Sequence, residues 1–207
     1  MSADRQNWFE GWRLFGWLTL ILAALCVAIA AMRGFEVDGI RAVIRFTART
    51  SLLFFCLAFS ASAVARLWPN AFTRWQRRNR RPLGVTFAAS HALHAGAIIA
   101  FANMDPSGFA GITSLASYVF GGIGCGFIIA MTATSFDATA AALGPRAWRA
   151  LHLVGGYYLL SQFMVSFGKR IPDMPLYSLF LIPLVLVFVL RMVAMASRST
   201  PRSVAAR

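Results

Sequence analysis

Three histidines, His91, His94 and His152, are the residues of this chain whose type and position could do chemistry. All three fall inside or at the edge of apolar segments long enough to cross a bilayer. A histidine at membrane depth is costly, so it needs a partner such as a metal, a proton path or a buried acceptor. His91 and His94 lie three residues apart on one predicted helix, and His152 lies on another. This arrangement could hold a haem iron between two helices.

The composition is that of an integral membrane protein. Of the 207 residues, 58% are hydrophobic and 13% are charged, whereas soluble domains are about 45–50% apolar and about 25% charged. A net charge of +13 could indicate nucleic-acid binding. The arginines, however, lie mainly in loops between apolar runs, where they follow the bias of positive charge toward the cytoplasm. We therefore expect membrane lipid as a partner and no nucleic acid.

Six apolar segments approach the length of about 20 residues that a spanning helix needs. They lie at about residues 12–32, 43–67, 83–102, 115–134, 147–167 and 176–196. Pro183 falls inside the last segment and predicts a kink there. We expect residues 1–207 to form a single domain, an all-α integral membrane protein built as a six-transmembrane-helix bundle.

Arginines and tryptophans predict the orientation of this bundle. The second connection, the fourth connection and the C-terminal tail are rich in arginine: Arg66, Arg74, Arg77, Arg78, Arg80, Arg81, Arg146, Arg149, Arg198, Arg202 and Arg207. Both termini should therefore be cytoplasmic, and we expect a multi-pass protein of a bacterial inner membrane. Six tryptophans fall at the same predicted face and would form an interfacial belt: Trp8, Trp12, Trp17, Trp68, Trp75 and Trp148.

The sequence lacks the signatures of several other classes of site. Cys26, Cys56 and Cys125 lie in separate apolar runs without C-x-x-C spacing, so we interpret them as small membrane-buried side chains. No dinucleotide-binding or P-loop glycine motif occurs. No Asp or Glu lies inside a predicted span, which argues against zinc, a di-metal site or a carboxylate proton relay. Any reducing power must come from a separate protein or a membrane quinol.

The surroundings of the histidines favour a haem among the possible ligands. Gly155 and Gly156 follow His152 by three and four residues, which would clear that helix face for a flat macrocycle. The alternative is that the histidines only form hydrogen bonds between helices. From spacing alone both interpretations stay open, as do roles in quinone binding or proton transfer.

Three stretches give the chain a resemblance to a known family. They are Thr-Ala-Arg-Thr at 47–50, Arg-Asn-Arg-Arg-Pro-Leu-Gly at 78–84, and Leu-Gly-Pro-Arg-Ala-Trp-Arg-Ala-Leu-His at 143–152. On these residues the chain resembles the ferric reductase-like transmembrane family, and within it the MsrQ-type haem-binding membrane subunits. The likeness covers the second to fifth predicted helices. It departs from the family's L-G-x-x-W-x-x-L-H run because Trp148 is displaced by one position.

The resemblance implies one haem b with His94 and His152 as axial ligands near the cytoplasmic side, and His91 as the alternative ligand. Such a bis-histidine iron shuttles electrons rather than binding oxygen. The family pattern has a further histidine along each of these two helices, but the thirteenth residue after His152 is Val165. The outer haem site is therefore expected to be lost. A second carrier such as a quinone would be needed at the outer side, where Arg49 could anchor it.

We therefore expect a membrane haem b electron-transfer protein, an oxidoreductase component that passes electrons from a separate donor to an unknown acceptor. The donor would be a flavoprotein reductase or a quinol, with a quinone or flavin as a possible further cofactor, and the acceptor could be a periplasmic protein. Two alternatives stay open. One is a haem-free membrane partner subunit, and the other is a membrane protein that binds a quinone or another small molecule.

Overall fold

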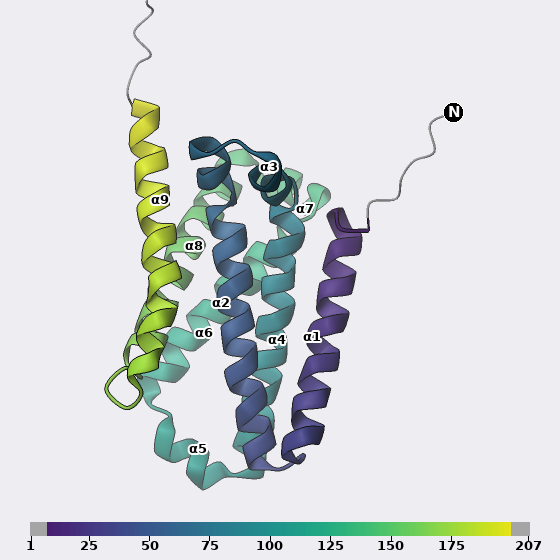
Figure 1. The fold of residues 1–207 in the computed structure, drawn as a ribbon, viewed down its shortest axis with the longest axis vertical. Coiled ribbons are helices and arrows are strands. Elements are labelled where there is room, and N and C mark those ends of the chain that lie inside the picture. The colour runs from purple at the N-terminus through teal and green to yellow at the C-terminus, as the bar shows by residue number, and fades with distance from the viewer. Residues whose placement is uncertain (1–7, 200–207) are drawn as a thin grey trace, which may run out of the picture.

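The computed structural model describes residues 8–199, and within this range every regular element is a helix (Figure 1). The helices are α1 (Gly11–Arg33), α2 (Val37–Leu67), α3 (Ala71–Arg78), α4 (Arg80–Met104), α5 (Pro106–Ile112), α6 (Leu115–Ala133), α7 (Asp137–Leu143), α8 (Pro145–Gly168), the 3-10 helix η1 (Pro175–Phe180) and α9 (Leu181–Ser199). The predicted tail arginines Arg202 and Arg207 lie outside the described residues.

The long helices stand roughly parallel around a central pair. Helices α2 and α4 pack side by side, α1 and α9 flank them, and α6 and α8 lie behind (Figure 1). Helices α3 and α7 cover one end of the bundle, where α1 begins and α9 ends, whereas α5 lies at the opposite end. We call the first end the arginine-rich end, because it carries Arg66, Arg74, Arg77, Arg78, Arg80, Arg81, Arg146 and Arg149.

Among the described residues, five helical segments are long and apolar enough to cross a membrane. They are Gly11–Arg33, Val37–Leu67, Arg80–Met104, Leu115–Ala133 and Pro175–Ser197, with mean hydropathies from 1.5 to 2.6. They coincide with five of the six predicted spans, and the chain is an all-α multi-pass bundle. The sixth predicted span, 147–167, is the 24-residue helix α8. It is not among the five, because polar residues such as His152 and Gln162 lower the hydropathy of its most apolar stretch.

Two details of the helices differ from the sequence prediction. Helix α2 begins at Val37, six residues before the predicted start at 43, and its 31 residues are about 46 Å long, which exceeds a hydrocarbon core of about 30 Å. The spanning segment Pro175–Ser197 changes from the 3-10 helix η1 to α9 at Leu181, so Pro183 does not interrupt a continuous α-helix as predicted. Helix α9 begins at Leu181 after η1, so Pro183 lies in its first turn, where a missing N–H breaks no intrahelical hydrogen bond.

Hydroxyl groups fill the interface between α2 and α4. Thr47, Ser51 and Ser90 are fully buried there. The hydroxyl of Ser90 lies 2.8 Å from that of Thr50 and accepts a hydrogen bond of 3.0 Å from that of Ser51. Small polar side chains let two helices approach closely and join them by hydrogen bonds, as is common between membrane helices. We call this interface the hydroxyl seam.

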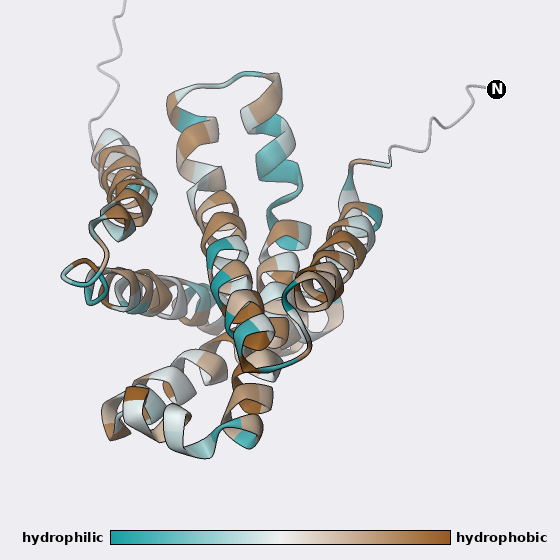
Figure 2. Ribbon diagram, turned by 60° about the horizontal axis from the view of Figure 1, so that its bottom comes forward, coloured by the Kyte–Doolittle hydropathy of each residue, from teal (hydrophilic) through white to brown (hydrophobic). Residues whose placement is uncertain are grey.

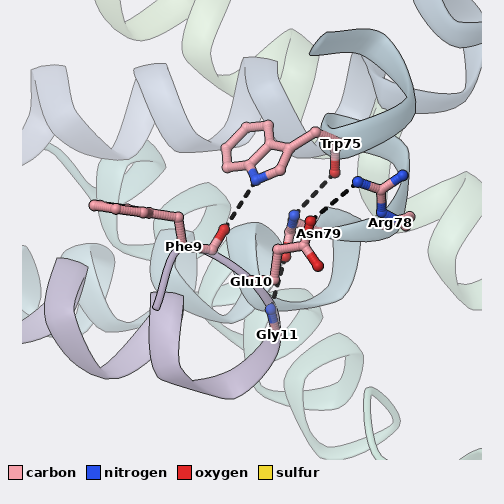
Figure 3. A network of polar contacts seen from close by, with 6 residues as sticks. All are labelled: Phe9, Glu10, Gly11, Trp75, Arg78 and Asn79. Carbon is pink, nitrogen blue, oxygen red and sulfur yellow. Dashed lines mark hydrogen bonds and ion pairs between the residues drawn. The ribbon is translucent and has the colours of Figure 1, made fainter. Parts of the chain in front are cut away.

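A polar network joins the start of α1 to the junction of α3 and α4 (Figure 3). We call it the α1 clasp, and its members are Phe9, Glu10, Gly11, Trp75, Arg78 and Asn79. The backbone N–H of Gly11 donates to the side-chain oxygen of Asn79 at 2.8 Å, and the amide nitrogen of Asn79 donates to the Trp75 carbonyl at 3.0 Å. The clasp therefore fixes the first helix against the arginine-rich end.

The substitution Asn79→Ala tests the clasp. Asn79 is only 1% exposed, so removing its amide leaves the Gly11 N–H without its acceptor. We expect the free energy of unfolding to fall by about 1–3 kcal/mol, measured by denaturation in detergent. Asn103→Ala is the control, because Asn103 is exposed and bonds only within its own helix. Equal losses in the two variants would contradict a specific role for Asn79.

Candidate functional site

His94 is held by hydrogen bonds that leave one of its ring nitrogens free. Its Nδ1 lies 3.1 Å from the carbonyl oxygen of Ile44 and 3.1 Å from the hydroxyl of Thr47, both on α2. A carbonyl only accepts, so we assign the proton to Nδ1, and Nε2 keeps its lone pair. A histidine oriented in this way through a backbone carbonyl is typical of metal ligands.

His91 lies one turn earlier on α4, beside His94. The two ring centres are 5.3 Å apart. The Nδ1 atom of His91 is buried and has no hydrogen-bond partner among the described residues. Buried polar atoms almost always have a partner, so this one indicates a site that involves more than the packing of the chain itself.

Both of these histidines line a cavity of about 440 Å³ between α4, α6 and α8, which we call the double-histidine cavity. Its α6 wall is open, because a Cβ atom added to Gly121 or Gly122 would meet nothing within 4 Å. Lys169 and Arg170 also line it and supply positive charge. The cavity therefore combines an imidazole, a flat open wall and two cations.

His152 lies in a different cavity, at the arginine-rich end. This arginine cavity has a volume of about 340 Å³ and is lined by basic, aromatic and aliphatic side chains. The His152 ring stacks on Trp148 with centres 4.3 Å apart, and its Nε2 lies 3.2 Å from the Thr134 hydroxyl. The Trp148 indole donates to the Thr134 carbonyl at 2.9 Å. Helices α6 and α8 are thus joined around this histidine.

The structure does not bring His94 and His152 together. Phe87 lines the arginine cavity and Phe163 lines the double-histidine cavity, and their ring centres are 6.1 Å apart in the wall between them. His152 follows the start of α8 at Pro145 by seven residues, about 10 Å. His94 follows the start of α4 at Arg80 by fourteen, about 21 Å. His152 shares its cavity with Arg80 and Arg81 at the start of α4, whereas His94 shares its cavity with Lys169 and Arg170, which follow the end of α8. The two imidazoles therefore lie at different depths.

Gly155 and Gly156 do not present the cleared face that the sequence predicts. A Cβ atom on Gly155 would lie 2.6 Å from Met131 Sδ, and one on Gly156 would lie 2.4 Å from the Phe59 ring. Side chains of α6 and α2 fill the space over both glycines. Their role here is to let these helices approach α8, because no side chain larger than hydrogen fits.

The other predicted site residue, Arg49, lines neither cavity. Its side chain is exposed on α2, and its guanidinium lies 5.4 Å from the ring centre of Phe180 in η1. Among the described residues no three His, Cys, Asp or Glu side chains group as a metal site. The structure adds Gln162 and Ser166 of α8, which line the double-histidine cavity together with His94. Sequence reasoning missed them because serine and glutamine have no motif spacing of their own.

Comparison with protein-family models, curated proteins and solved structures finds no match for this chain. The resemblance to the ferric reductase-like family therefore stays an expectation, carried by the three sequence stretches alone.

The substitution Gly156→Ala tests the packing at α8. Its new methyl group would overlap the Phe59 ring, so we expect a loss of about 1–3 kcal/mol in the free energy of unfolding. Gly126→Ala on α6 is the matched control, because its methyl group would meet nothing within 4 Å. Thermal unfolding of the two variants in the same detergent gives the comparison. If Gly156→Ala were as stable as Gly126→Ala, the close approach of Phe59 to Gly156 would be contradicted.

Proposed function

We propose that this chain is a six-span membrane protein with cytoplasmic termini that binds one haem b through His94 and carries electrons. The observation that carries the proposal is the hydrogen bonding of His94. The Ile44 carbonyl and the Thr47 hydroxyl engage Nδ1, which leaves Nε2 for an iron in the double-histidine cavity.

The topology rests on α8 and on the charges. Helix α8 packs against both α6 and α9 and has 24 residues, about 36 Å, which is enough to cross a hydrocarbon core of about 30 Å. The arginine-rich end matches the excess of arginine found on cytoplasmic loops. The start of α1 and the end of α9 lie at this same end (Figure 1), which supports a cytoplasmic position for both termini.

The double-histidine cavity fits a haem in three respects. The open wall at Gly121 and Gly122 leaves room for a flat group. Lys169 and Arg170 can form charge-assisted hydrogen bonds with the two propionates. His91 adds a buried ring nitrogen that has no partner within the described chain. A haem bound here would supply one-electron chemistry.

The geometry favours one histidine ligand rather than the pair expected from the family. His152 is separated from the double-histidine cavity by the aromatic wall, and the polar side chains that α8 contributes to that cavity are Gln162 and Ser166. Neither is a usual ligand of haem iron. We therefore assign His94 as the axial ligand, with His91 as the alternative on the same helix.

The depth of His94 bears on the electron donor. His94 precedes the end of α4 at Met104 by ten residues, about 15 Å, so it lies nearer the end opposite the arginines. A membrane quinol reaches this depth through the lipid, whereas a cytoplasmic flavoprotein stays at the surface. We propose a quinol as donor and a periplasmic protein as acceptor.

Visible spectra of the protein from haem-replete cells, purified in detergent, test the haem and its ligand. We expect a haem Soret band that shifts on reduction with dithionite, is lost in His94→Ala and is retained in His152→Ala. His91→Ala should shift the band without abolishing it. A colourless protein would contradict the proposal and favour the haem-free partner subunit. Loss of the band in a folded His152→Ala variant would restore the pair expected from the family.

Matched single cysteines test the topology. Ala110 on α5 and Ala138 on α7 are exposed at opposite ends of the bundle. In a variant without native cysteines, Ala110→Cys should react with a membrane-impermeant thiol reagent on intact spheroplasts. Ala138→Cys should react only after permeabilisation. The reverse pattern would show that the orientation is wrong, and reaction of both on intact spheroplasts would show that α6, which lies between the two positions, does not cross the membrane.

A further inference from the structure

We propose that the arginine cavity binds an amphiphile with a phosphate headgroup, and that in the membrane this is an anionic phospholipid of the cytoplasmic leaflet. The site is separate from the haem site and does not depend on it. It relies on the proposed orientation only for the choice of leaflet.

The charge of the cavity rim is the first support. Arg77, Arg78, Arg80 and Arg81 all line it, and no acidic residue of the described range 8–199 does. In the part of the chain that the structure describes, Arg78 pairs with Glu10 and Arg81 with Asp137. Arg77 and Arg80 have no acidic partner within that range. The rim therefore presents more positive charge than the protein neutralises.

Arg80 is the arginine of the rim whose charge most needs an anionic partner. It is the first residue of α4, its side chain is partly buried, and it donates no hydrogen bond within the described residues. The like charge of Arg191 on α9 repels it. Arg191 itself donates a hydrogen bond of 2.8 Å to the Phe59 carbonyl, and its guanidinium lies 3.9 Å from the centre of the Phe59 ring. A cation withdrawn from water needs an anion or hydrogen-bond acceptors, and this one faces the cavity.

The floor of the cavity is apolar, and this favours an amphiphile over a free ion as the ligand. Phe55, Phe59, Phe87, Ile128 and Leu159 form it. A volume of about 340 Å³ is within the range of small-molecule pockets, about 300–1,000 Å³. A free anion would leave this apolar floor unfilled, and a neutral hydrocarbon would leave the arginines unpaired. A molecule with an anionic head and an apolar body satisfies both parts.

The donors at the rim favour phosphate as the headgroup. A guanidinium presents its N–H groups in a fixed fork that matches phosphate oxygens bidentately. Several such forks from α3 and the start of α4 converge on one rim, and a phosphate offers more acceptor oxygens than a carboxylate does. Basic pockets between helices on the cytoplasmic side are a known way for membrane proteins to hold lipid headgroups.

The first experiment uses the unmodified full chain, purified in a non-ionic detergent. Thermal unfolding is followed by tryptophan fluorescence while phosphatidylglycerol, phosphatidylcholine or inorganic phosphate is added. We expect saturable stabilisation by phosphatidylglycerol alone. Equal stabilisation by phosphatidylcholine would overturn the headgroup assignment, and equal stabilisation by inorganic phosphate would overturn the amphiphile.

Variants then locate the site. Arg80→Gln should weaken the affinity for phosphatidylglycerol about 10- to 100-fold, as expected for loss of a charged hydrogen-bonded contact. Arg74→Gln is the matched control, because it removes the same charge from an exposed residue of α3 that does not line the cavity. The affinity of this variant for phosphatidylglycerol should stay within about twofold of that of the unmodified protein. Equal affinities of the two variants would overturn the proposal.

A steric variant covers the case in which Arg80→Gln does not fold. Gly84 lines the cavity, and a Cβ atom placed on it would meet only Ala58, at 3.9 Å. Gly84→Leu should therefore fold, fill part of the cavity and reduce phosphatidylglycerol binding without changing the charge. Undiminished binding by folded Gly84→Leu would place the lipid elsewhere on the protein.

Discussion

The hydroxyl seam between α2 and α4 is the contact on which the rest of the bundle depends. Lipid tails are as apolar as leucine, so burial of apolar side chains gives membrane helices little reason to associate. Ser90 joins the two helices through the hydroxyls of Thr50 and Ser51. Thr47, in the same seam, is also a partner of His94. The contact that fixes the central helices therefore also sets the orientation of the imidazole.

An aromatic wall divides the interior around this seam into two sites of different chemistry. Phe55 packs against both Phe87 and Phe163, with ring centres 5.6 and 5.3 Å apart. On one side lie two histidines and an open glycine wall, and on the other lie the arginines and His152. Figure 2 shows that apolar residues make up much of the long helices. The histidines of both sites are thus partly buried in a bundle of apolar helices, whereas Arg77, Arg78 and Arg81 are exposed at its end.

The sequence predicts the spanning helices well because a long apolar run is a local property. It does not predict how far one helix is shifted along another. Spacing places His94 fourteen residues into α4 and His152 seven into α8 once the helix starts are known, but the relative depth depends on how those helices dock. The neighbours of Gly155 likewise cannot be predicted from the sequence, because Met131 belongs to α6 and reaches Gly155 only through the packing of the helices. The short helices α3, α5 and α7 carry too few apolar residues to give a signal.

The α1 clasp has a consequence for biosynthesis. Gly11 binds Asn79 across 68 residues of sequence, so the acceptor does not exist when the first helix leaves the ribosome. Helix α1 must then enter the bilayer by its own hydropathy of 2.5, and only 22% of its most apolar stretch becomes buried by the rest of the protein. Until α3 and α4 have been made, α1 can pack only against α2, which follows it after three residues. Closing of the clasp then fixes the start of α1 against the arginine-rich end, and this step can occur only after α3 has been made.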